Sequence, residues 1–118
     1  MATAILLIDH YNEFLHPKGK ANPRVKESLE ASGTVENLKK VVKVARDQNI
    51  PIFHCMHQQV DSKTFQGWQL MNRSLEAISK ALLFEKGSFG AEFYEGLEPD
   101  VAKGDVVVSR HWNSRYDD

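Results

Sequence analysis

The chain has 118 residues, of which 42% are hydrophobic and 26% are charged, and its formal net charge is -1 at pH 7. This length allows one domain with a real core, and the composition is that of a folded chain and not of a disordered one. The near-balance of charge excludes sequence-blind binding to nucleic acid or to an anionic membrane.

The N-terminal residues carry no targeting signal of a standard kind. The first four residues hold no basic region, and the apolar run after them, Ile5–Ile8, is too short for a signal peptide or a membrane span. Cys55 is the only cysteine, so no intrachain disulfide can form, which fits a reducing compartment. We therefore expect a cytoplasmic protein, with non-standard secretion left open.

The first predicted element is a strand from about Ala4 to Ile8. Its apolar run stops abruptly at Asp9, and a short continuous run of this kind is typical of a strand buried on both faces. Asp9 then lies at the C-terminal tip, where open α/β sheets place their ligands. A polar loop with Pro17 and Pro23 follows, and residues 24–31 form either a short helix or more loop.

The clearest helix is predicted from Thr34 to Asn49, with Thr34 as its N-cap. Its apolar stripe consists of Val35, Leu38, Val41, Val42 and Ala45. Pro51–Met56 reads as the second strand, because proline is tolerated at a strand's first residue. The order strand, helix, strand implies a right-handed crossover between parallel strands.

A second helical stripe lies between Gly67 and Phe84, and it consists of Met71, Leu75, Ile78 and Leu82. Residues 85–99 form a loop rich in glycine and aromatic residues, with room for a short helical turn. Val106–Val108 is the third predicted strand, and Arg110 follows at its C-terminal end. The pattern predicts an α/β fold with about three parallel strands.

Asp9 and Arg110 are the strongest candidates for a functional site. Both follow predicted parallel strands, whose C-terminal ends share one edge of the sheet, so the two side chains can meet there. The Arg110 guanidinium would hold Asp9 ionised, and the pair could then take a proton from a nucleophile or orient one. A structural ion pair that closes the sheet edge is the alternative. Phe14 and Trp112 flank the two charged residues and could wall a small apolar pocket.

The other chemically versatile residues are weaker candidates. His54 and His57 point to opposite faces of an extended segment, so a structural or pocket-lining role is favoured over a metal site. Cys55 lies inside a predicted strand and is expected to behave as a small hydrophobic residue. No glycine-rich phosphate cradle follows the first strand and no Gly-x-Ser-x-Gly elbow occurs, so we predict no cofactor.

Several segments together resemble one family. Ile5–Phe14 reads ILLIDHYNEF and resembles the opening strand of the isochorismatase-like cysteine hydrolases, which commonly has an apolar run, Asp, a Met-Gln-like pair, Asn, Asp and Phe. Gly87–Phe93, Leu97–Pro99 and Gly104–Ser114 resemble the middle section of that family. The segments follow in the family's order, and the resemblance covers the chain up to about Ser114.

This resemblance implies a three-layer, Rossmann-like parallel sheet with flanking helices and a small-molecule substrate, either an enol ether of the isochorismate type or an amide. The family uses an Asp, Lys and Cys triad. Asp9 matches the aspartate, the general base for the thiol, and Phe14 matches a pocket wall. The lysine position falls on Arg110, which keeps the positive charge but cannot give up a proton.

The resemblance also implies that the nucleophilic cysteine belongs to a helix start after a fourth strand, beyond the Arg115–Asp118 end. We therefore expect residues 1–118 to be a single, C-terminally truncated domain that is inactive as a hydrolase. Its first strand would become a sheet edge, which favours a homo-oligomer or pairing with a family member. The alternatives are a non-catalytic interaction or regulatory protein that pairs through this edge, and a simple small-ligand binder.

Overall fold

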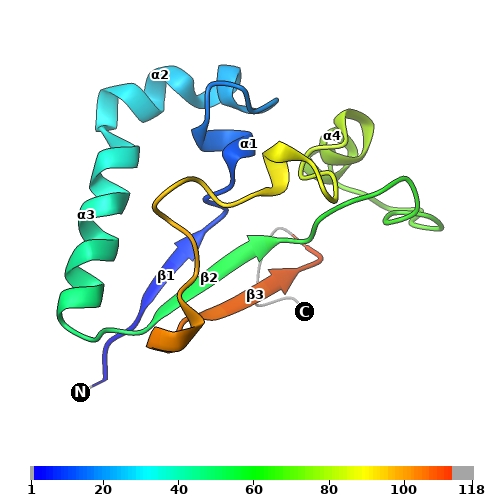
Figure 1. The fold of residues 1–118 in the computed structure, drawn as a ribbon. Coiled ribbons are helices and arrows are strands. Elements are labelled where there is room, and N and C mark those ends of the chain that lie inside the picture. Colours follow the sequence, from blue (N-terminus) through cyan, green and yellow to red (C-terminus); the bar gives the residue numbers. More distant parts are fainter. Residues whose placement is uncertain (1, 113–118) are drawn as a thin grey trace.

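The computed structural model describes residues 2–112. Three parallel strands form one sheet in the order β1-β2-β3: β1 (Ile5–Ile8), β2 (Ile52–His57) and β3 (Val106–Arg110). Ile8 pairs with Cys55, and His57 pairs with Arg110, so all three strands end along the same edge (Figure 1). The predicted strands and their parallel order are confirmed, with bounds moved by one or two residues.

Four helices and two 3₁₀ turns connect the strands: α1 (Asn12–Leu15), α2 (Asn22–Ser32), α3 (Thr34–Asp47), α4 (Arg73–Ala81), η1 (Phe89–Ala91) and η2 (Val101–Lys103). In Figure 1, α3 runs along the β1 side of the sheet, while α1, α2 and α4 lie near the C-terminal ends of the strands. These three helices therefore lie around the edge where the sequence predicts a site.

Gly33 separates α2 from α3. Its φ of 59° lies in the left-handed region, where glycine carries no Cβ penalty, and it both ends α2 and precedes α3. The segment 24–31 is thus helical and not a loop. The prediction that Thr34 is an N-cap is wrong, because Thr34 is already the first helical residue and its side chain makes no capping bond.

α3 packs against one face of the sheet. Val42 and Ala45 of the helix share a buried cluster with Leu7 of β1 and Ile52 of β2. Val41, predicted to belong to the buried stripe, is 41% exposed. The helix therefore contacts the sheet through a narrower stripe than the sequence suggested.

The opposite face of the sheet is open over its outer strands. Leu6 of β1 and Val106 of β3 share this face, because both pair with Phe53, and they are 43% and 41% exposed. Ile8 is 62% exposed. The prediction that the first strand is buried on both faces is wrong, because the face that carries Leu6 and Ile8 is exposed. The separate prediction that this strand is an edge of the sheet is confirmed for the described residues, since β2 is its one neighbour there.

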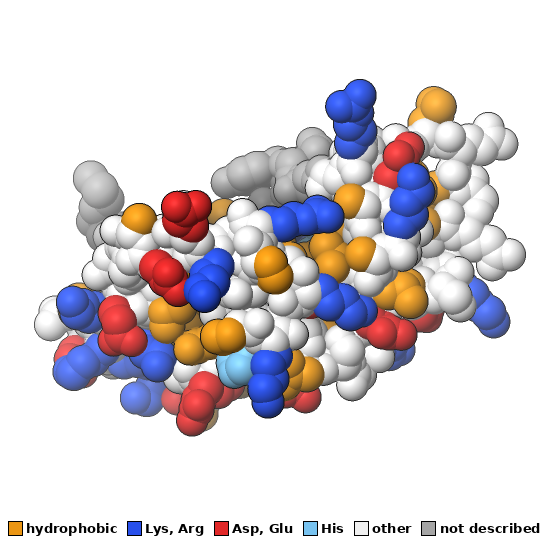
Figure 2. Space-filling view, turned by 90° about the horizontal axis from the view of Figure 1, so that it is seen from above, with side chains coloured by type: hydrophobic (Ala, Val, Ile, Leu, Met, Phe, Trp, Pro, Cys, Tyr) orange, Lys and Arg blue, Asp and Glu red, His pale blue; other side chains and the backbone are white. Residues whose placement is uncertain are grey.

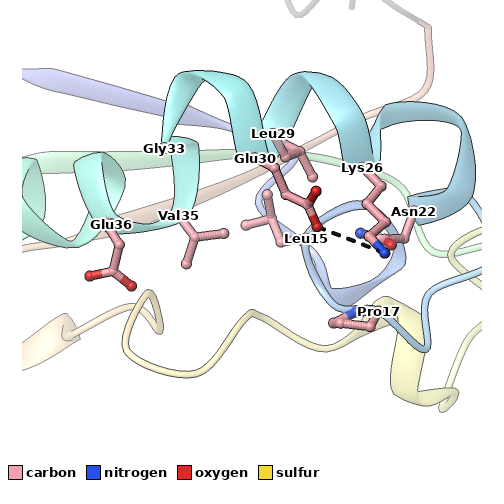
Figure 3. A pocket seen from close by; sticks show the side chains of 9 residues that line it. All are labelled: Leu15, Pro17, Asn22, Lys26, Leu29, Glu30, Gly33, Val35 and Glu36. Carbon is pink, nitrogen blue, oxygen red and sulfur yellow. Dashed lines mark ion pairs between the residues drawn. The ribbon is translucent and has the colours of Figure 1, made fainter.

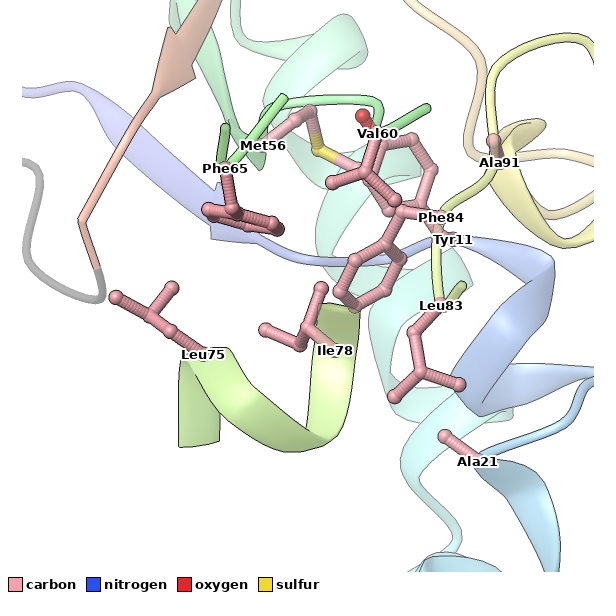
Figure 4. Packing of buried hydrophobic residues seen from close by; sticks show 10 residues of the cluster. All are labelled: Tyr11, Ala21, Met56, Val60, Phe65, Leu75, Ile78, Leu83, Phe84 and Ala91. Atoms are coloured by element: carbon pink, nitrogen blue, oxygen red, sulfur yellow. The ribbon is translucent and has the colours of Figure 1, made fainter. Parts of the chain in front are cut away.

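α4 is shorter than the helical stripe that predicts it. Asn72 caps its start by accepting a hydrogen bond from the Leu75 N–H, and Leu82, with a φ of 47°, ends it. Leu75 and Ile78 then insert into a second buried cluster around Phe84 (Figure 4). This cluster forms the apolar floor under the C-terminal edge of the sheet.

Basic and acidic side chains are intermixed on the face shown in Figure 2, as the balanced composition predicts. Among residues 2–112, the helices are too short or too polar to cross a lipid bilayer.

Candidate functional site

Asp9 and Arg110 meet at the C-terminal edge of the sheet, as the sequence predicts. Arg110 Nη1 donates to Asp9 Oδ1 at 2.8 Å, and Nη2 donates to Asp9 Oδ2. This two-pronged pairing is the geometry that suits a guanidinium and a carboxylate. The hydrogen bonds to Asp9 raise the pKa of Arg110 above its ordinary value, so the guanidinium stays charged.

The backbone of β2 completes the surroundings of the Asp9 carboxylate. The His57 N–H donates to Oδ1 at 2.8 Å, so among residues 2–112 Oδ1 accepts two hydrogen bonds and Oδ2 accepts one, from Arg110. Because each carboxylate oxygen offers about two acceptor positions, Oδ2 keeps one position open. The Asp9 side chain is 22% exposed, so part of it is in contact with solvent.

Asp9 itself has a φ of 53°, in the left-handed region that Asp tolerates better than most residues. The Asp9 N–H donates to the Cys55 carbonyl at 3.2 Å, and Arg110 Nη1 donates to the same oxygen at 3.3 Å. The chain therefore turns sharply at the strand end, and β2 holds both partners of the ion pair in place.

A pocket of about 420 Å³ opens beside the ion pair. Asp9, Arg110 and His57 line it at the sheet edge, and Phe14 and Phe84 are among its apolar walls. Its volume lies within the range of small-molecule sites, about 300–1,000 Å³. The mixture of an apolar wall and a few charged groups suits a small organic ligand.

His57 lines this pocket, and its ring contains a buried hydrogen-bond acceptor. Its Nδ1 lies 2.8 Å from the Gln58 carbonyl, which can only accept, so Nδ1 carries the hydrogen. Burial lowers the pKa of His57 below its ordinary value, and the ring is therefore neutral at pH 7. The other nitrogen, Nε2, is then an acceptor, and it has no hydrogen-bond partner among residues 2–112.

The structure separates the two predicted pocket aromatics. Phe14 lines the pocket, whereas Trp112 packs on Trp68 with ring centroids 4.9 Å apart and does not line it. Cys55 is 1% exposed in the interior of β2, and its Sγ donates to the Phe53 carbonyl at 3.5 Å. Neither Trp112 nor the Cys55 thiol contributes to the pocket surface.

A buried polar chain connects α3 to the loop after β1, and sequence reasoning missed it. Arg46 Nη1 and Nη2 donate to Asp105 at 2.5 Å each, Asp105 accepts from His54 at 3.0 Å, and His54 Nδ1 lies 2.8 Å from His10 Nε2. No local pattern marks these partners, because each comes from a different element. Residues 2–112 contain no cluster of three metal-ligating side chains.

The protonation of this chain follows from its geometry. Burial opposes ionisation of Asp105, but hydrogen bonds from Arg46, the Asp100 N–H and His54 outweigh it and hold its pKa far below the ordinary range. Burial first, and then the neighbouring His54, lower the pKa of His10 to about 4. His10 is therefore neutral at pH 7, and the chain joins the elements as a structural support.

Glu13 is a second buried support that the sequence did not single out. It is 1% exposed, and its carboxylate accepts from the Lys20 N–H at 2.6 Å and from the Phe84 N–H at 2.9 Å. A Cβ on Gly90 would lie 2.5 Å from Glu13 Oε2, so only glycine fits there. Glu13 thus ties α1 to the segment that carries Phe84 into the pocket wall.

A second, smaller pocket of about 230 Å³ lies between α2 and α3 (Figure 3). Leu15, Leu29 and Val35 line it, beside an exposed Lys26–Glu30 ion pair of 3.8 Å. None of the site residues that the sequence predicts lies there. The Lys26–Glu30 pair lies in solvent, whereas the Asp9–Arg110 pair is largely withdrawn from it, so the pocket at Asp9 is the better candidate for chemistry.

The sequence profile of the isochorismatase domain matches residues 3–118, and the chain therefore belongs to the isochorismatase domain family. Its fold is similar to that of N-carbamoylsarcosine amidase from Thermoplasma acidophilum, with 22% identity and a TM-score of 0.51 over 94% of this chain and 53% of that one. It is also similar to a cysteine hydrolase from Pseudomonas syringae pv. phaseolicola, with 19% identity and a TM-score of 0.61 over 94% and 47% of the two chains.

At such identities the likeness to solved structures establishes the fold, an α/β parallel sheet flanked by helices, and the chain spans about half the length of either protein. No curated protein matches the chain. The resemblance of Asn113 and Ser114 to the family's middle section, and the expectation for Arg115–Asp118, lie outside the described residues.

Proposed function

We propose that the pocket beside Asp9 is the substrate site of a small-molecule hydrolase, acting on an enol ether of the isochorismate type or on an amide. Membership of the isochorismatase family supports the reaction class. The observation that carries the proposal is the Asp9 carboxylate, which lines the pocket with one acceptor position of Oδ2 still open.

In this proposal Asp9 is the general base, and Oδ2 is the atom that receives the proton from a nucleophile. A general base needs hydrogen-bond reach to the proton that it abstracts, and the open position of Oδ2 provides it. Arg110 keeps the carboxylate oriented through its two hydrogen bonds. Because arginine does not give up its proton at physiological pH, its part is electrostatic, and it does not act as an acid.

We further propose that these 118 residues by themselves do not turn over substrate. Their one cysteine, Cys55, is buried in β2 and does not line the pocket. A nucleophilic thiol must be accessible and close to its base. Asp9 therefore has no thiol of this chain to activate.

The test is to incubate the purified chain with isochorismate and with simple amides, beside a Cys55→Ala variant of matched circular dichroism. We expect no product from either protein. Turnover that Cys55→Ala abolishes would make Cys55 the nucleophile, and turnover that survives Cys55→Ala would require a mechanism without a cysteine. Either result overturns the proposed inactivity.

A second candidate function is association with another chain. The open side of the sheet favours it, because Leu6 and Ile8 of edge strand β1 are 43% and 62% exposed. An edge strand with apolar side chains is a template for pairing, and a two-fold axis at β1 would join two sheets through identical surfaces. We propose a second copy of this chain as the occupant.

Light scattering coupled to size exclusion tests this association. We expect a dimer that Leu6→Lys converts to a monomer, since a charge at the centre of such an interface is left unpaired. Val101→Lys is the control, because Val101 is 74% exposed and belongs to η2 and not to edge strand β1. A compact wild-type monomer would overturn the second candidate.

A further inference from the structure

A third pocket, of about 290 Å³, lies between the start of α1 and the segment that runs from η1 to Glu98. It shares no described lining residue with the pocket at Asp9. Its lining is acidic, because Glu92, Glu95 and Glu98 belong to it and no lysine or arginine does. None of these three carboxylates forms an ion pair within residues 2–112. Like charges this close repel one another, so a bound cation would be stabilised here.

Aromatic rings form much of the remaining wall. Phe89 is 43% exposed, and His16 packs edge-on against it with ring centroids 4.8 Å apart. The ring of Tyr94 already carries a cation, since Lys39 Nζ of α3 lies 5.5 Å from its centroid. Faces of aromatic rings attract ammonium and guanidinium groups. The wall therefore suits an organic cation with an apolar chain better than a hydrated metal ion.

Asn12 adds a carbonyl oxygen without a partner. The residue is 5% exposed, and its Nδ2 donates to the Phe89 carbonyl at 3.1 Å, which fixes the orientation of the amide. Oδ1 accepts no hydrogen bond from residues 2–112, and unlike His57 Nε2 it is not enclosed by protein atoms. Of the described pockets, Asn12 lines this one alone. Oδ1 therefore opens into it, where an N–H of a ligand would satisfy the acceptor.

The pocket keeps its shape without a ligand. The Asn12 N–H donates to the Glu92 carbonyl at 2.9 Å, and the Tyr94 N–H donates to the His10 carbonyl at 3.2 Å. Leu97, which is 0% exposed, anchors the same segment in the cluster under α3. A site formed in advance loses less conformational freedom when a ligand binds.

We propose that this pocket binds a small aliphatic diammonium ion. Set against the one ammonium group of Lys39, the three carboxylates leave two negative charges, which two ligand ammonium groups match. One ammonium donates to Asn12 Oδ1, and the alkyl chain packs against the ring of Phe89. The inference does not rest on the proposed hydrolase activity, because the two pockets are separate.

Three ligands with the same four-carbon chain separate charge from shape. Putrescine has two ammonium groups, n-butylamine has one, and 1,4-butanediol has none. Titration calorimetry on the full chain should show putrescine binding roughly tenfold more tightly than n-butylamine, since hydrogen bonds between charged groups have effects of this order. No binding of 1,4-butanediol is expected.

Variants of matched circular dichroism then assign the contacts. Glu95→Gln should weaken putrescine binding roughly threefold, the effect of one exposed ion pair. Glu27→Gln is the control, because it removes the same charge from α2, and Glu27 lines none of the described pockets. Phe89→Leu keeps an apolar side chain without a ring face and should also weaken binding roughly threefold. In NMR spectra, putrescine should shift the side-chain amide signal of Asn12.

Equal losses in Glu95→Gln and Glu27→Gln would show diffuse attraction of cations to the surface and would overturn the site. Equal affinity for putrescine and n-butylamine would overturn the diammonium assignment, and it would indicate a single ammonium such as that of a lysine side chain. An unmoved Asn12 signal, or full affinity in Phe89→Leu, would overturn the role of that residue. No putrescine binding at millimolar concentration would overturn the inference as a whole.

Discussion

Asp9 and Arg110 form a two-pronged ion pair across the end of β2, although 101 positions separate them in the chain. The pair is largely withdrawn from water, with side-chain exposures of 22% for Asp9 and 8% for Arg110. Asp9 directly follows β1 and Arg110 is the last residue of β3, so the pair also links the two outer strands of the described sheet. Site geometry and fold stability are thus coupled at this position.

Replacing Arg110 by Met should lower the free energy of unfolding by about 2–4 kcal/mol, because Asp9 is then left as a partly buried charge without its partner. Arg110→Lys keeps the charge but loses the two-pronged geometry, so it should lower the free energy of unfolding by about 1 kcal/mol. Urea unfolding followed by circular dichroism measures both variants. The Asp9→Asn/Arg110→Met double variant should recover part of the loss, and an additive result would contradict the coupling.

Removing the Asp105 carboxylate should destabilise the fold by about 2–3 kcal/mol, since Asp105→Asn leaves the Arg46 guanidinium without its paired acceptors. Asp47→Asn is the matched control. Asp47 pairs with Lys43 on the exposed face of α3, and the loss of that surface pair should change the unfolding free energy by less than about 0.5 kcal/mol. Similar losses in both variants would show that the buried chain contributes little.

Stability should fall as the pH decreases from about 6.5 toward 4, in a manner that depends on His10. The pKa of His10 is lowered from 6.5 to about 4 in the folded chain, so between these values the unfolded chain takes up a proton that the folded chain refuses. The stabilisation is complete above pH 6.5 and is lost as the pH falls, by roughly 2–3 kcal/mol.

Urea unfolding between pH 7.5 and 4.5 measures this slope. His10→Phe removes the titrating group and should flatten the dependence. His57, whose pKa is also lowered, contributes in the same direction and leaves a residual slope. An identical slope in the wild type and in His10→Phe would contradict the assignment.

Gly90→Ala should destabilise the fold by about 2–3 kcal/mol, because the added Cβ would lie 2.5 Å from the buried Glu13 carboxylate. Gly87→Ala is the control. No atom from elsewhere in the chain would lie within 4 Å of its Cβ, and only the φ of 79° is unfavourable for alanine. Gly87→Ala should therefore lower the free energy of unfolding by about 1 kcal/mol. The comparison isolates steric overlap with Glu13, and equal losses would exclude it.

Much of the fold follows from local pattern. The apolar runs of β1, β2 and β3 and the stripe of α3 predict these elements to within one or two residues, because burial imposes a period on each. α4 was placed correctly but too long, since Leu82 adopts a left-handed conformation that no residue pattern announces. The exposure of Leu6 and Ile8 could not be predicted from their strand alone. Whether another element covers a face of a strand depends on segments elsewhere in the chain.

The sequence by itself placed Asp9 and Arg110 at one edge of the sheet, where they could meet, because the carboxyl ends of parallel strands share that edge. Only the tertiary structure decided what surrounds them. The approach of α2 and α4 brings Arg24 and Arg73 to the pocket, and the Gln58 carbonyl fixes the hydrogen of His57 on Nδ1. Such arrangements depend on packing between distant segments, which residue spacing along one segment does not encode.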